Sequence, residues 1–339
     1  MSGFFGYAKR APYRYRERFG LAFEEFEIGQ VFEHRPGVDV TQQDNLEEAL
    51  ETQNNAQLHY DSHYARQTEW AHPLGVSTMT IQRLLGMTSR TFYRRRNFLG
   101  LDEIAMTRPV FGGDTLYACT RITGKAEGGD TRVGNLSLVT EGHNQHGKRI
   151  AKITYRIEVF RAGQLPEDEH LAIAEEERFR LYHPGREGAL VEQTGLYFED
   201  FVEGESFEHW PGMSIDAAES RRHALRSLEI NPRYSCATPQ IFEPFVIGAV
   251  TALTTRTFGR VVANLGWTEV ALPRPVRPGE TIRAISTVTG KRESAKRPDQ
   301  GILHVETSGN GEDDTPVCRF KRALLVYKQG LGPYAKAGY

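Results

Sequence analysis

The sequence predicts an α+β protein that contains two copies of one unit, each a curved antiparallel sheet wrapped round a long central helix. Three observations predict this fold class: an internal repeat, one strongly apolar helical stretch in each copy, and long runs of alternating apolar and polar residues. The repeat is collinear, because residues 23–29 return at 198–204 and residues 108–115 return at 274–281. Several matches in one order along the chain indicate that an ancestral unit was duplicated.

The start of each copy predicts a strand followed by a capped helix. In the first copy, we expect a short strand over residues 29–34 that ends at the turn Pro36-Gly37. A helix then begins near Thr41, where Asp44 lies three positions further on and completes a capping pattern. An irregular segment over residues 54–73 follows this helix.

The rest of each copy predicts the central helix and the main strands. The first copy has a helical pattern over residues 76–92, and its counterpart over 245–258 is apolar on nearly every side, which is typical of a buried helix. Alternating residues over 115–122 and 150–159 predict antiparallel strands with one solvated face.

We expect five segments along the chain. The segment between the two copies carries acidic runs at 166–169 and 175–177, which are typical of a solvated linker. The N-terminal segment interleaves arginine with tyrosine, and we expect an arm that packs on a neighbouring subunit, with RNA binding as the weaker alternative. The predicted segments are the arm (1–19), the first repeat (20–161), the linker (162–195), the second repeat (196–328) and a C-terminal tail (329–339).

Composition excludes several functional classes. The 42 lysines and arginines balance 44 acidic residues, so the chain has no bulk positive field for nucleic acid or an anionic membrane. No apolar run is long enough to predict a membrane-spanning helix. Cys119, Cys236 and Cys318 lack metal-ligand spacing, which disfavours a disulfide framework or a zinc site and favours a reducing cytoplasm. We therefore expect a cytoplasmic protein without a metal, either a monomer or a homodimer.

The pattern resembles a known family. A helix, then Arg-Pro-Val-x-x-Gly-Asp/Glu-Thr, then long strands is similar to the hotdog fold of MaoC-like hydratases and dehydratases, and the duplication resembles their double-hotdog form. Residues 53–60 and 262–267 are similar to mesaconyl-CoA hydratases, also called β-methylmalyl-CoA dehydratases. The resemblance implies a tandem hotdog and a hydro-lyase that acts across the 2,3 double bond of an enoyl-CoA thioester, with a branched or dicarboxylic acyl unit such as mesaconyl as one option.

The same resemblance implies site residues in the first repeat. The family motif, Asp-x-Asn-Pro-aliphatic-His, aligns with residues 54–59, which keep the histidine and replace the acid by Asn54. His59 is the expected base, because an imidazole has an unperturbed pKa of about 6.5 and can both take and return a proton. A capping or packing histidine is the alternative. Asn54 would orient water or the imidazole, or else fix the loop.

The missing carboxylate has two candidate replacements. Asp61 lies two residues beyond His59, and Glu229 lies at the position of Asn54 in the second repeat, although a solvated turn is the default for both. The second repeat has Tyr234 where the first has His59, which indicates a degenerate site.

Donors for the thioester oxygen are expected at the start of the central helix. The first N–H groups of a helix lack internal partners and lie at the positive end of its dipole. Gly75 and Val76 occupy this point, where a glycine leaves room for a thioester to approach, although a plain glycine at a helix start is the alternative. Arg94, Arg95 and Arg96 could meet the anionic tail of coenzyme A, or else form a solvated helix end.

Two other functions stay open at this point. Hotdog folds also host acyl-CoA thioesterases, and the loss of the acid is compatible with a non-catalytic protein that binds acyl thioesters. In all three cases the expected partner is an acyl-CoA or acyl-carrier thioester, and no cofactor is expected beyond the coenzyme A of the substrate.

Overall fold

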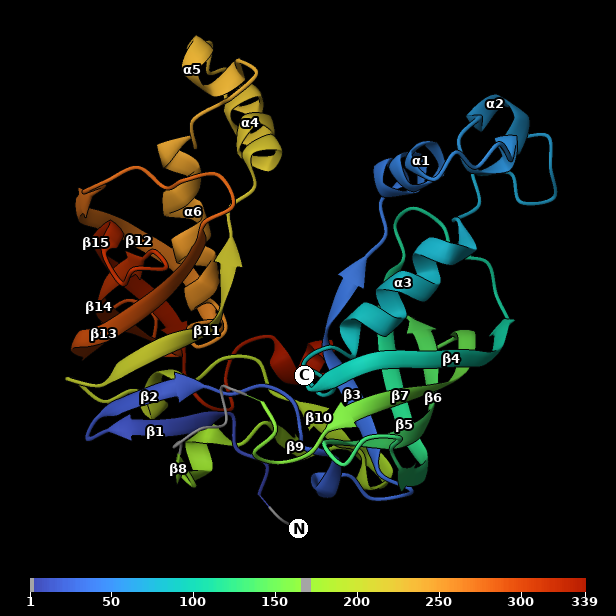
Figure 1. The fold of residues 1–339 in the computed structure, drawn as a ribbon, viewed down its shortest axis with the longest axis horizontal. Helices are drawn as coiled ribbons and strands as arrows, with labels where there is room; N and C mark the ends of the chain where they lie inside the picture. The colour runs from blue at the N-terminus through green and yellow to red at the C-terminus, as the bar shows by residue number, and fades with distance from the viewer. Residues whose placement is uncertain (1–2, 166–171) are drawn as a thin grey trace. The chain divides into compact units, whose positions relative to one another are not determined.

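The computed structural model describes residues 3–165 and 172–339 and divides into two compact units (Figure 1). The first-repeat unit contains the chain that begins at Phe19, together with Tyr182–Gln193 and Tyr339. The second-repeat unit contains the chain up to Arg18, a segment that ends at Leu181, and Thr194–Gly338. Each unit therefore combines most of one repeat with a short segment from before the other. The acidic run expected at 166–169 lies outside the described residues.

The first-repeat unit is a seven-stranded sheet whose long helix α3 contacts β3, β5 and β6. Its strands follow the order β4-β7-β6-β5-β3-β10-β9. Its elements are β3 (Val31–Asp39), α1 (Gln42–Glu51), α2 (Ser62–Ala65), α3 (Ser77–Met87), β4 (Arg95–Met106), β5 (Thr115–Glu127), β6 (Val133–Asn144), β7 (Arg149–Phe160), β9 (Tyr182–Pro184) and β10 (Leu190–Glu192).

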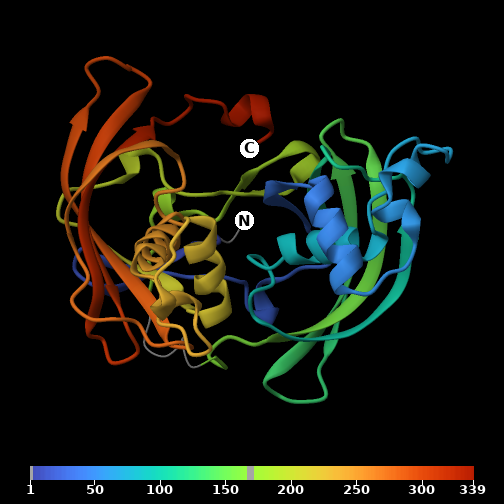
Figure 2. The ribbon, with the colours of Figure 1, turned by 90° about the horizontal axis from the view of Figure 1, so that it is seen from above.

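The second-repeat unit is an eight-stranded sheet that curves round the apolar helix α6 (Figure 2). Its strands follow the order β12-β15-β14-β13-β11-β2-β1-β8. Its elements are β1 (Tyr7–Ala11), β2 (Arg14–Glu17), β8 (Ala172–Ile173), β11 (Ser206–Ser214), α4 (Ala217–Arg226), α5 (Pro232–Ser235), α6 (Glu243–Thr254), β12 (Val261–Ala271), β13 (Thr281–Glu293), β14 (Gln300–Asn310), β15 (Pro316–Tyr327) and α7 (Tyr334–Ala337). Short 3-10 turns lie at Phe23–Glu25, Gln57–His59, Glu177–Phe179, Arg186–Gly188 and Phe198–Asp200.

The predicted tandem hotdog is confirmed, and the local prediction at α1 also holds. Thr41 caps α1 by accepting the N–H of Asp44 at 3.1 Å, while the Asp44 carboxylate accepts the N–H of Thr41 at 2.8 Å. Both central helices end earlier than the sequence pattern predicts, α3 at Met87 and α6 at Thr254. The apolar pattern continues beyond these residues, but the chain there forms a turn instead of more helix.

The sequence predicted that the first strand of each repeat ends at the Pro-Gly pair, but both strands continue beyond it. β3 continues to Asp39 through a cis Arg35–Pro36 bond, and its pairing with β5 shifts register between His34 and Val38. β11 has the same arrangement around Pro211. A strand accommodates proline where its register is interrupted, since no ladder hydrogen bond is then required from the missing N–H.

Two short segments complete the sheets in a way that the sequence analysis did not predict. β2 pairs in parallel with β11, with Tyr15 opposite Phe207, and β10 pairs in parallel with β3, with Val191 opposite Glu33. The N-terminal arm therefore belongs to the second-repeat sheet rather than packing on a neighbouring subunit, and the predicted linker carries strands. Both sheets are consequently mixed, because each has one parallel pair beside its antiparallel hotdog strands.

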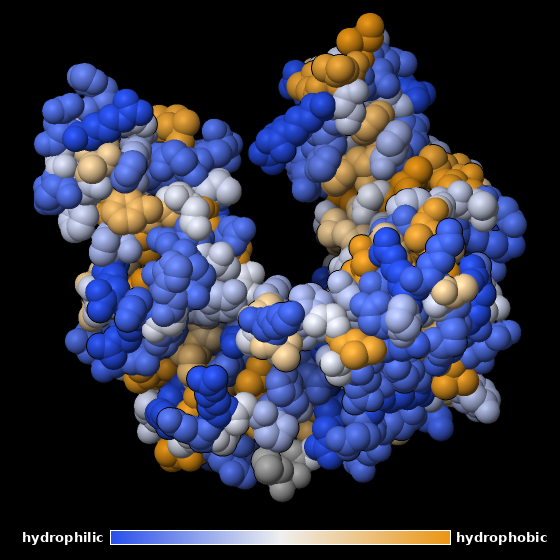
Figure 3. Space-filling model, turned by 180° about the vertical axis from the view of Figure 1, so that it is seen from behind, coloured by the Kyte–Doolittle hydropathy of each residue, from blue (hydrophilic) through white to orange (hydrophobic). Residues whose placement is uncertain are grey.

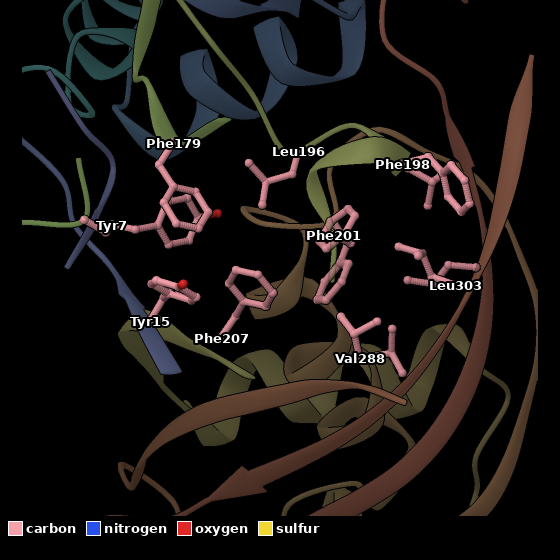
Figure 4. Close-up of a cluster of buried hydrophobic side chains, with 14 residues drawn as sticks. Tyr7, Tyr15, Phe179, Leu196, Phe198, Phe201, Phe207, Val288 and Leu303 are labelled. Carbon is pink, nitrogen blue, oxygen red and sulfur yellow. The ribbon is translucent and has the colours of Figure 1, made fainter. Parts of the chain in front are cut away.

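The arm contributes to the apolar core of the second-repeat unit (Figure 4). Tyr7 and Tyr15 point toward Phe179 and Phe207, with ring centroids 4.5 Å apart for Tyr7 and Phe179 and 4.9 Å apart for Tyr15 and Phe179. Removal of the arm would expose these rings, so the arm is part of the fold.

A buried histidine in each sheet contacts a glutamate from the added strand. His34 Nδ1 lies 3.0 Å from Glu192, and His209 Nδ1 lies 2.9 Å from Glu17. The other ring nitrogen also has a partner in each case, since His34 Nε2 lies 2.8 Å from the hydroxyl of Thr120 and His209 Nε2 contacts a serine hydroxyl on β13. These fully partnered histidines anchor β10 and β2 to their sheets.

The surface carries two kinds of exposed apolar group. The tip formed by α4 and α5 shows apolar side chains (Figure 3), among them Leu228 and Ile230, which are 87% and 91% exposed. The edge strands β4 and β12 also expose apolar residues, including Phe98 and Trp267. Among residues 3–165 and 172–339, none of the helices has the length and apolar character that a membrane span needs.

Candidate functional site

One buried side chain connects the loop that carries His59 to the start of α3. The amide Nδ2 of Asn45 donates to the carbonyl oxygens of His59 (2.9 Å) and Leu74 (3.0 Å), and its Oδ1 accepts the N–H of Val76 at 2.7 Å. Asn45 projects from α1 and is 1% exposed. Three of its hydrogen bonds therefore fix these two segments relative to each other.

The second repeat retains only part of this connection. Ser220, at the position of Asn45, accepts the N–H of Phe242 at 2.8 Å through its hydroxyl. A hydroxyl has one hydrogen to donate where an amide NH₂ has two. The two contacts that hold the His59 loop are thus specific to the first repeat.

The imidazole of His59 is oriented by a backbone carbonyl. Its Nδ1 lies 2.7 Å from the oxygen of Leu74. A carbonyl only accepts hydrogen bonds, so Nδ1 must carry the hydrogen, and the neutral ring then keeps its lone pair on Nε2. The Leu74 carbonyl therefore fixes the tautomer of His59 and leaves Nε2 able to accept a proton.

Asn54 fixes the loop and does not contact His59 in the described structure. Its Oδ1 accepts the N–H of Ala56 at 3.0 Å, and its own N–H donates to Ala49 at 2.8 Å. Glu229 makes the same pair of contacts, with the N–H of Asn231 (2.8 Å) and with Ala224 (3.0 Å). Because the two repeats use this position identically, the structure favours the loop-fixing interpretation of Asn54 over the water-orienting one.

Asp61 is a helix cap rather than a replacement for the missing acid. Its Oδ1 accepts the N–H of Tyr64 at 2.9 Å, at the start of α2, and its side chain is exposed. An aspartate that caps a helix in this way is held by the local backbone. This contact favours the solvated-turn interpretation of Asp61 over its use as a replacement for the missing acid.

The N–H groups of Gly75 and Val76 are already engaged. Gly75 donates to the carbonyl of Val110 at 2.8 Å, and Val76 donates to Asn45. The expectation that these two groups receive the thioester oxygen is corrected, because the first N–H groups of α3 without a helical partner are those of Ser77 and Thr78. Gly75 is required for packing, since an added Cβ would lie 2.8 Å from the Val110 oxygen.

A pocket of about 260 Å³ opens at the start of α3. Ser77 and Thr80 line it from the helix, and Trp70, Leu74 and Gly75 line it from the preceding loop. The other lining residues are Met106, at the end of β4, and the four that follow it, Thr107, Arg108, Pro109 and Val110. His59 and Asn54 do not line the pocket, but His59 is bonded to Leu74, which does.

The corresponding point of the second repeat is occupied by a carboxylate. Glu243, the first residue of α6, contacts the hydroxyl of Tyr234, which in turn contacts the guanidinium of Arg233. Burial and the contact with Glu243 raise the pKa of Tyr234. A carboxylate at the positive end of a helix repels a second anion, and Pro244 has no N–H to offer. The helix start of the second repeat thus differs chemically from that of the first, and the degenerate site at Tyr234 stays a prediction.

Of the three consecutive arginines, Arg95 and Arg96 begin β4 and Arg94 lies in the turn before it, so they are not a solvated helix end. Arg96 pairs with Glu158 and Asp130, both at 3.0 Å, and the guanidinium of Arg95 lies 4.0 Å from the ring centre of Phe98. Arg94 is buried. Arg95 and Arg96 therefore have structural partners, which weakens their candidacy as ligands for a coenzyme A tail.

Sequence reasoning missed Asn45, Thr80 and Arg108. Asn45 gave one available signal, because its repeat counterpart Ser220 also has a side-chain oxygen within a predicted helix. Arg108 was noticed only as part of the repeated motif. No group of three or more histidine, cysteine or acidic side chains among the described residues is arranged to hold a metal ion.

Comparisons with known proteins agree with the sequence resemblance. Residues 186–331 match the family model described as mesaconyl-CoA hydratase. The mesaconyl-CoA hydratase of Cereibacter sphaeroides is 30% identical over 155 residues, which are 42% of this chain and 45% of that protein. The resemblance to mesaconyl-CoA hydratases is confirmed.

Another relative and a solved structure also resemble parts of this chain at low sequence identity. The β-methylmalyl-CoA dehydratase of Chloroflexus aurantiacus is 24% identical over 119 residues, covering 35% of this chain and 34% of that protein. A solved Mycobacterium tuberculosis protein with a double hotdog fold aligns over 91% of this chain and 99% of its own, at 16% identity and a TM-score of 0.38. The chain thus spans less than half the length of the curated relatives it matches. The family match lies in the second repeat, whereas the pocket and His59 lie in the first.

Proposed function

We propose that the chain adds water to, or removes water from, the 2,3 double bond of an enoyl-CoA thioester, with His59 as the catalytic base. The observation that carries this proposal is the hydrogen bond from His59 Nδ1 to the Leu74 carbonyl, because it leaves Nε2 as a proton acceptor. The pocket beside Leu74 supplies the place for the acyl unit. The named activities of the similar proteins support the same reaction class.

The proposed hydration uses one imidazole twice. His59 Nε2 takes a proton from water, and the hydroxide oxygen forms a bond to C3 as the C2–C3 π electrons move toward the thioester carbonyl. The N–H groups of Ser77 and Thr78 stabilise the resulting enolate oxygen at the positive end of α3. The enolate then re-forms the carbonyl as C2 takes the proton from Nε2, so water adds to one face and the imidazole returns to its neutral form.

The test follows loss of the conjugated thioester absorbance of crotonyl-CoA and mesaconyl-CoA. We expect the wild type to hydrate at least one of them and His59→Ala to be slower by about 10² to 10⁴-fold, the range for loss of a positioned general base. His63→Ala is the matched control, because His63 is an exposed histidine on α2 four residues away. A His59→Ala variant as fast as the wild type would contradict the assignment.

A thiol assay separates the alternatives. Release of free coenzyme A would indicate a thioesterase, and binding without either reaction would indicate a non-catalytic thioester-binding protein. The background in this assay should come from Cys236, which is exposed. Burial raises the pKa of Cys119 and of Cys318 to about 11, so these thiols react slowly.

A further inference from the structure

The pocket contains one arginine that the protein itself does not neutralise. Arg108 lines the pocket, is exposed, and makes no ion pair with the residues that the structure describes. Its counterpart in the second repeat, Arg274, is held by Glu280 at 2.6 Å and by Asp313 at 3.0 Å. The two repeats therefore differ in what satisfies this arginine.

The difference has a local cause. The first repeat has Asp114 where the second has Glu280, and the aspartate is one methylene shorter. Asp114 accepts the N–H of Phe111 at 3.0 Å and the side-chain amide of Gln145 at 3.1 Å, so its carboxylate is engaged elsewhere. Duplication of one ancestral motif has thus left a clamped arginine in one repeat and an unclamped one at the pocket of the other.

A second, independent feature of the pocket also lacks a partner. Thr80 lines the pocket from α3, is 1% exposed, and its hydroxyl has no hydrogen-bond partner among the described residues. A buried hydroxyl without a partner is costly, by about 1–3 kcal/mol in mutational data. A ligand that accepts a hydrogen bond in the pocket would remove this cost.

We infer that Arg108 and Thr80 bind the free carboxylate of a dicarboxylic acyl thioester, which makes them specificity-determining residues. This inference rests on the proposed function. A guanidinium and a hydroxyl offer donors that match a carboxylate, and the guanidinium also balances its charge. Both residues line the same small pocket as Ser77, at the helix start that the proposed function assigns to the thioester carbonyl. The phosphates of coenzyme A are separated from that carbonyl by the whole pantetheine arm, so the acyl carboxylate is the anion within reach.

The test compares two thioesters that share coenzyme A and differ in the acyl carboxylate. We expect Arg108→Met to lower the ratio of kcat/KM for mesaconyl-CoA to kcat/KM for crotonyl-CoA by about 10 to 10²-fold, the effect of losing hydrogen bonds between charged groups. Thr80→Val, which keeps the shape, should lower the same ratio by about tenfold. Arg66→Met is the matched control, because Arg66 is an exposed arginine outside the pocket lining.

Calorimetric measurement of Kd tests the carboxylate site without requiring turnover. In Arg108→Met, the Kd for mesaconyl-CoA should rise more than the Kd for crotonyl-CoA. If this difference is found but the wild type turns over neither thioester, only the proposed function fails. Equal losses for both thioesters would show that Arg108 binds a phosphate of coenzyme A and would overturn the inference. No loss for either would overturn it as well.

Discussion

At the scale of single residues, backbone and amide groups position His59 in the first repeat. The Leu74 carbonyl fixes the tautomer of His59, and Asn45 fixes both residues through their carbonyl oxygens. The arrangement therefore leaves Nε2 as the proton acceptor in the proposed reaction.

We expect Asn45→Ser to reduce activity more than its effect on stability would suggest. Serine is the natural residue at this position of the second repeat, so it should preserve the contact with Val76 while the donors to His59 and Leu74 are lost. Loss of these donors should cost about 1–3 kcal/mol of unfolding free energy and lower kcat by about tenfold or more. The measurements are urea unfolding and kcat with the better enoyl-CoA substrate.

Ser220→Ala provides the control for this variant. It removes the corresponding contact in the second repeat, so it should lower stability by a similar amount and leave kcat near the wild-type value. If Asn45→Ser loses stability but keeps its kcat, Asn45 does not position His59.

At the residue level, the sequence points to a motif position but does not reveal contacts that local backbone geometry decides. His59 could be selected from its motif, because only one histidine occupies that position. Asp61 and Asn54 have suitable chemistry nearby, but each side chain is spent on the first N–H groups of a turn or helix. Those contacts depend on dihedral angles that a sequence motif does not reveal.

At the scale of elements, the short strands β2 and β10 are equivalent parts of the duplication. Glu17 and Glu192 are 175 residues apart, the same spacing as Tyr7 and Tyr182. Tyr7 lies 3.0 Å from the hydroxyl of Thr257, and Tyr182 lies 2.9 Å from the hydroxyl of the corresponding Thr91. The repeat therefore includes the segments that the sequence analysis assigned to an arm and a linker. These two segments share too few identical residues for the repeat to be recognised from sequence.

We expect Glu192→Gln to destabilise the protein in a pH-dependent way. Burial alone would raise the pKa of Glu192, but His34, Arg90 and Thr91 lower it below its ordinary value. A lowered pKa means that the ionised carboxylate stabilises the fold above the unfolded-state pKa of about 4.3, and that this stability is lost as the pH falls further. At pH 7 the variant should lose about 3 kcal/mol, and its difference in Tm from the wild type should shrink below about pH 4.

Thermal unfolding between pH 3 and pH 7 measures this effect. Glu51→Ala is the control, because Glu51 is an exposed glutamate at the end of α1 in the same unit, and its curve should follow the wild type. A constant difference in Tm at every pH would show that the Glu192 charge does not stabilise the fold.

At the scale of the whole molecule, the duplicated chain keeps its framework and varies its sites. Both repeats retain the buried histidine–glutamate contact and the connection from the first helix to the start of the central helix. They differ at the site, where His59 and Ser77 correspond to Tyr234 and Glu243. The duplication and the hotdog fold were predictable, because apolar periodicity and repeated motifs encode them. The assignment of β2 and β10 to sheets was not, because strand partners depend on long-range pairing.

The exchange of these short strands has a consequence for how the gene can be divided. Residues 20–161 produced alone would lack β10, so His34 would face an unfilled sheet edge, and we expect that polypeptide to aggregate. Adding residues 182–193 through a flexible tether should restore a soluble, cooperatively melting product, which gel filtration and circular dichroism would detect. If the shorter polypeptide were soluble and melted cooperatively, β10 would not be needed. If it aggregates as expected, each half of the gene encodes a strand that completes the sheet of the other repeat. Neither half could then be deleted or recombined without the other.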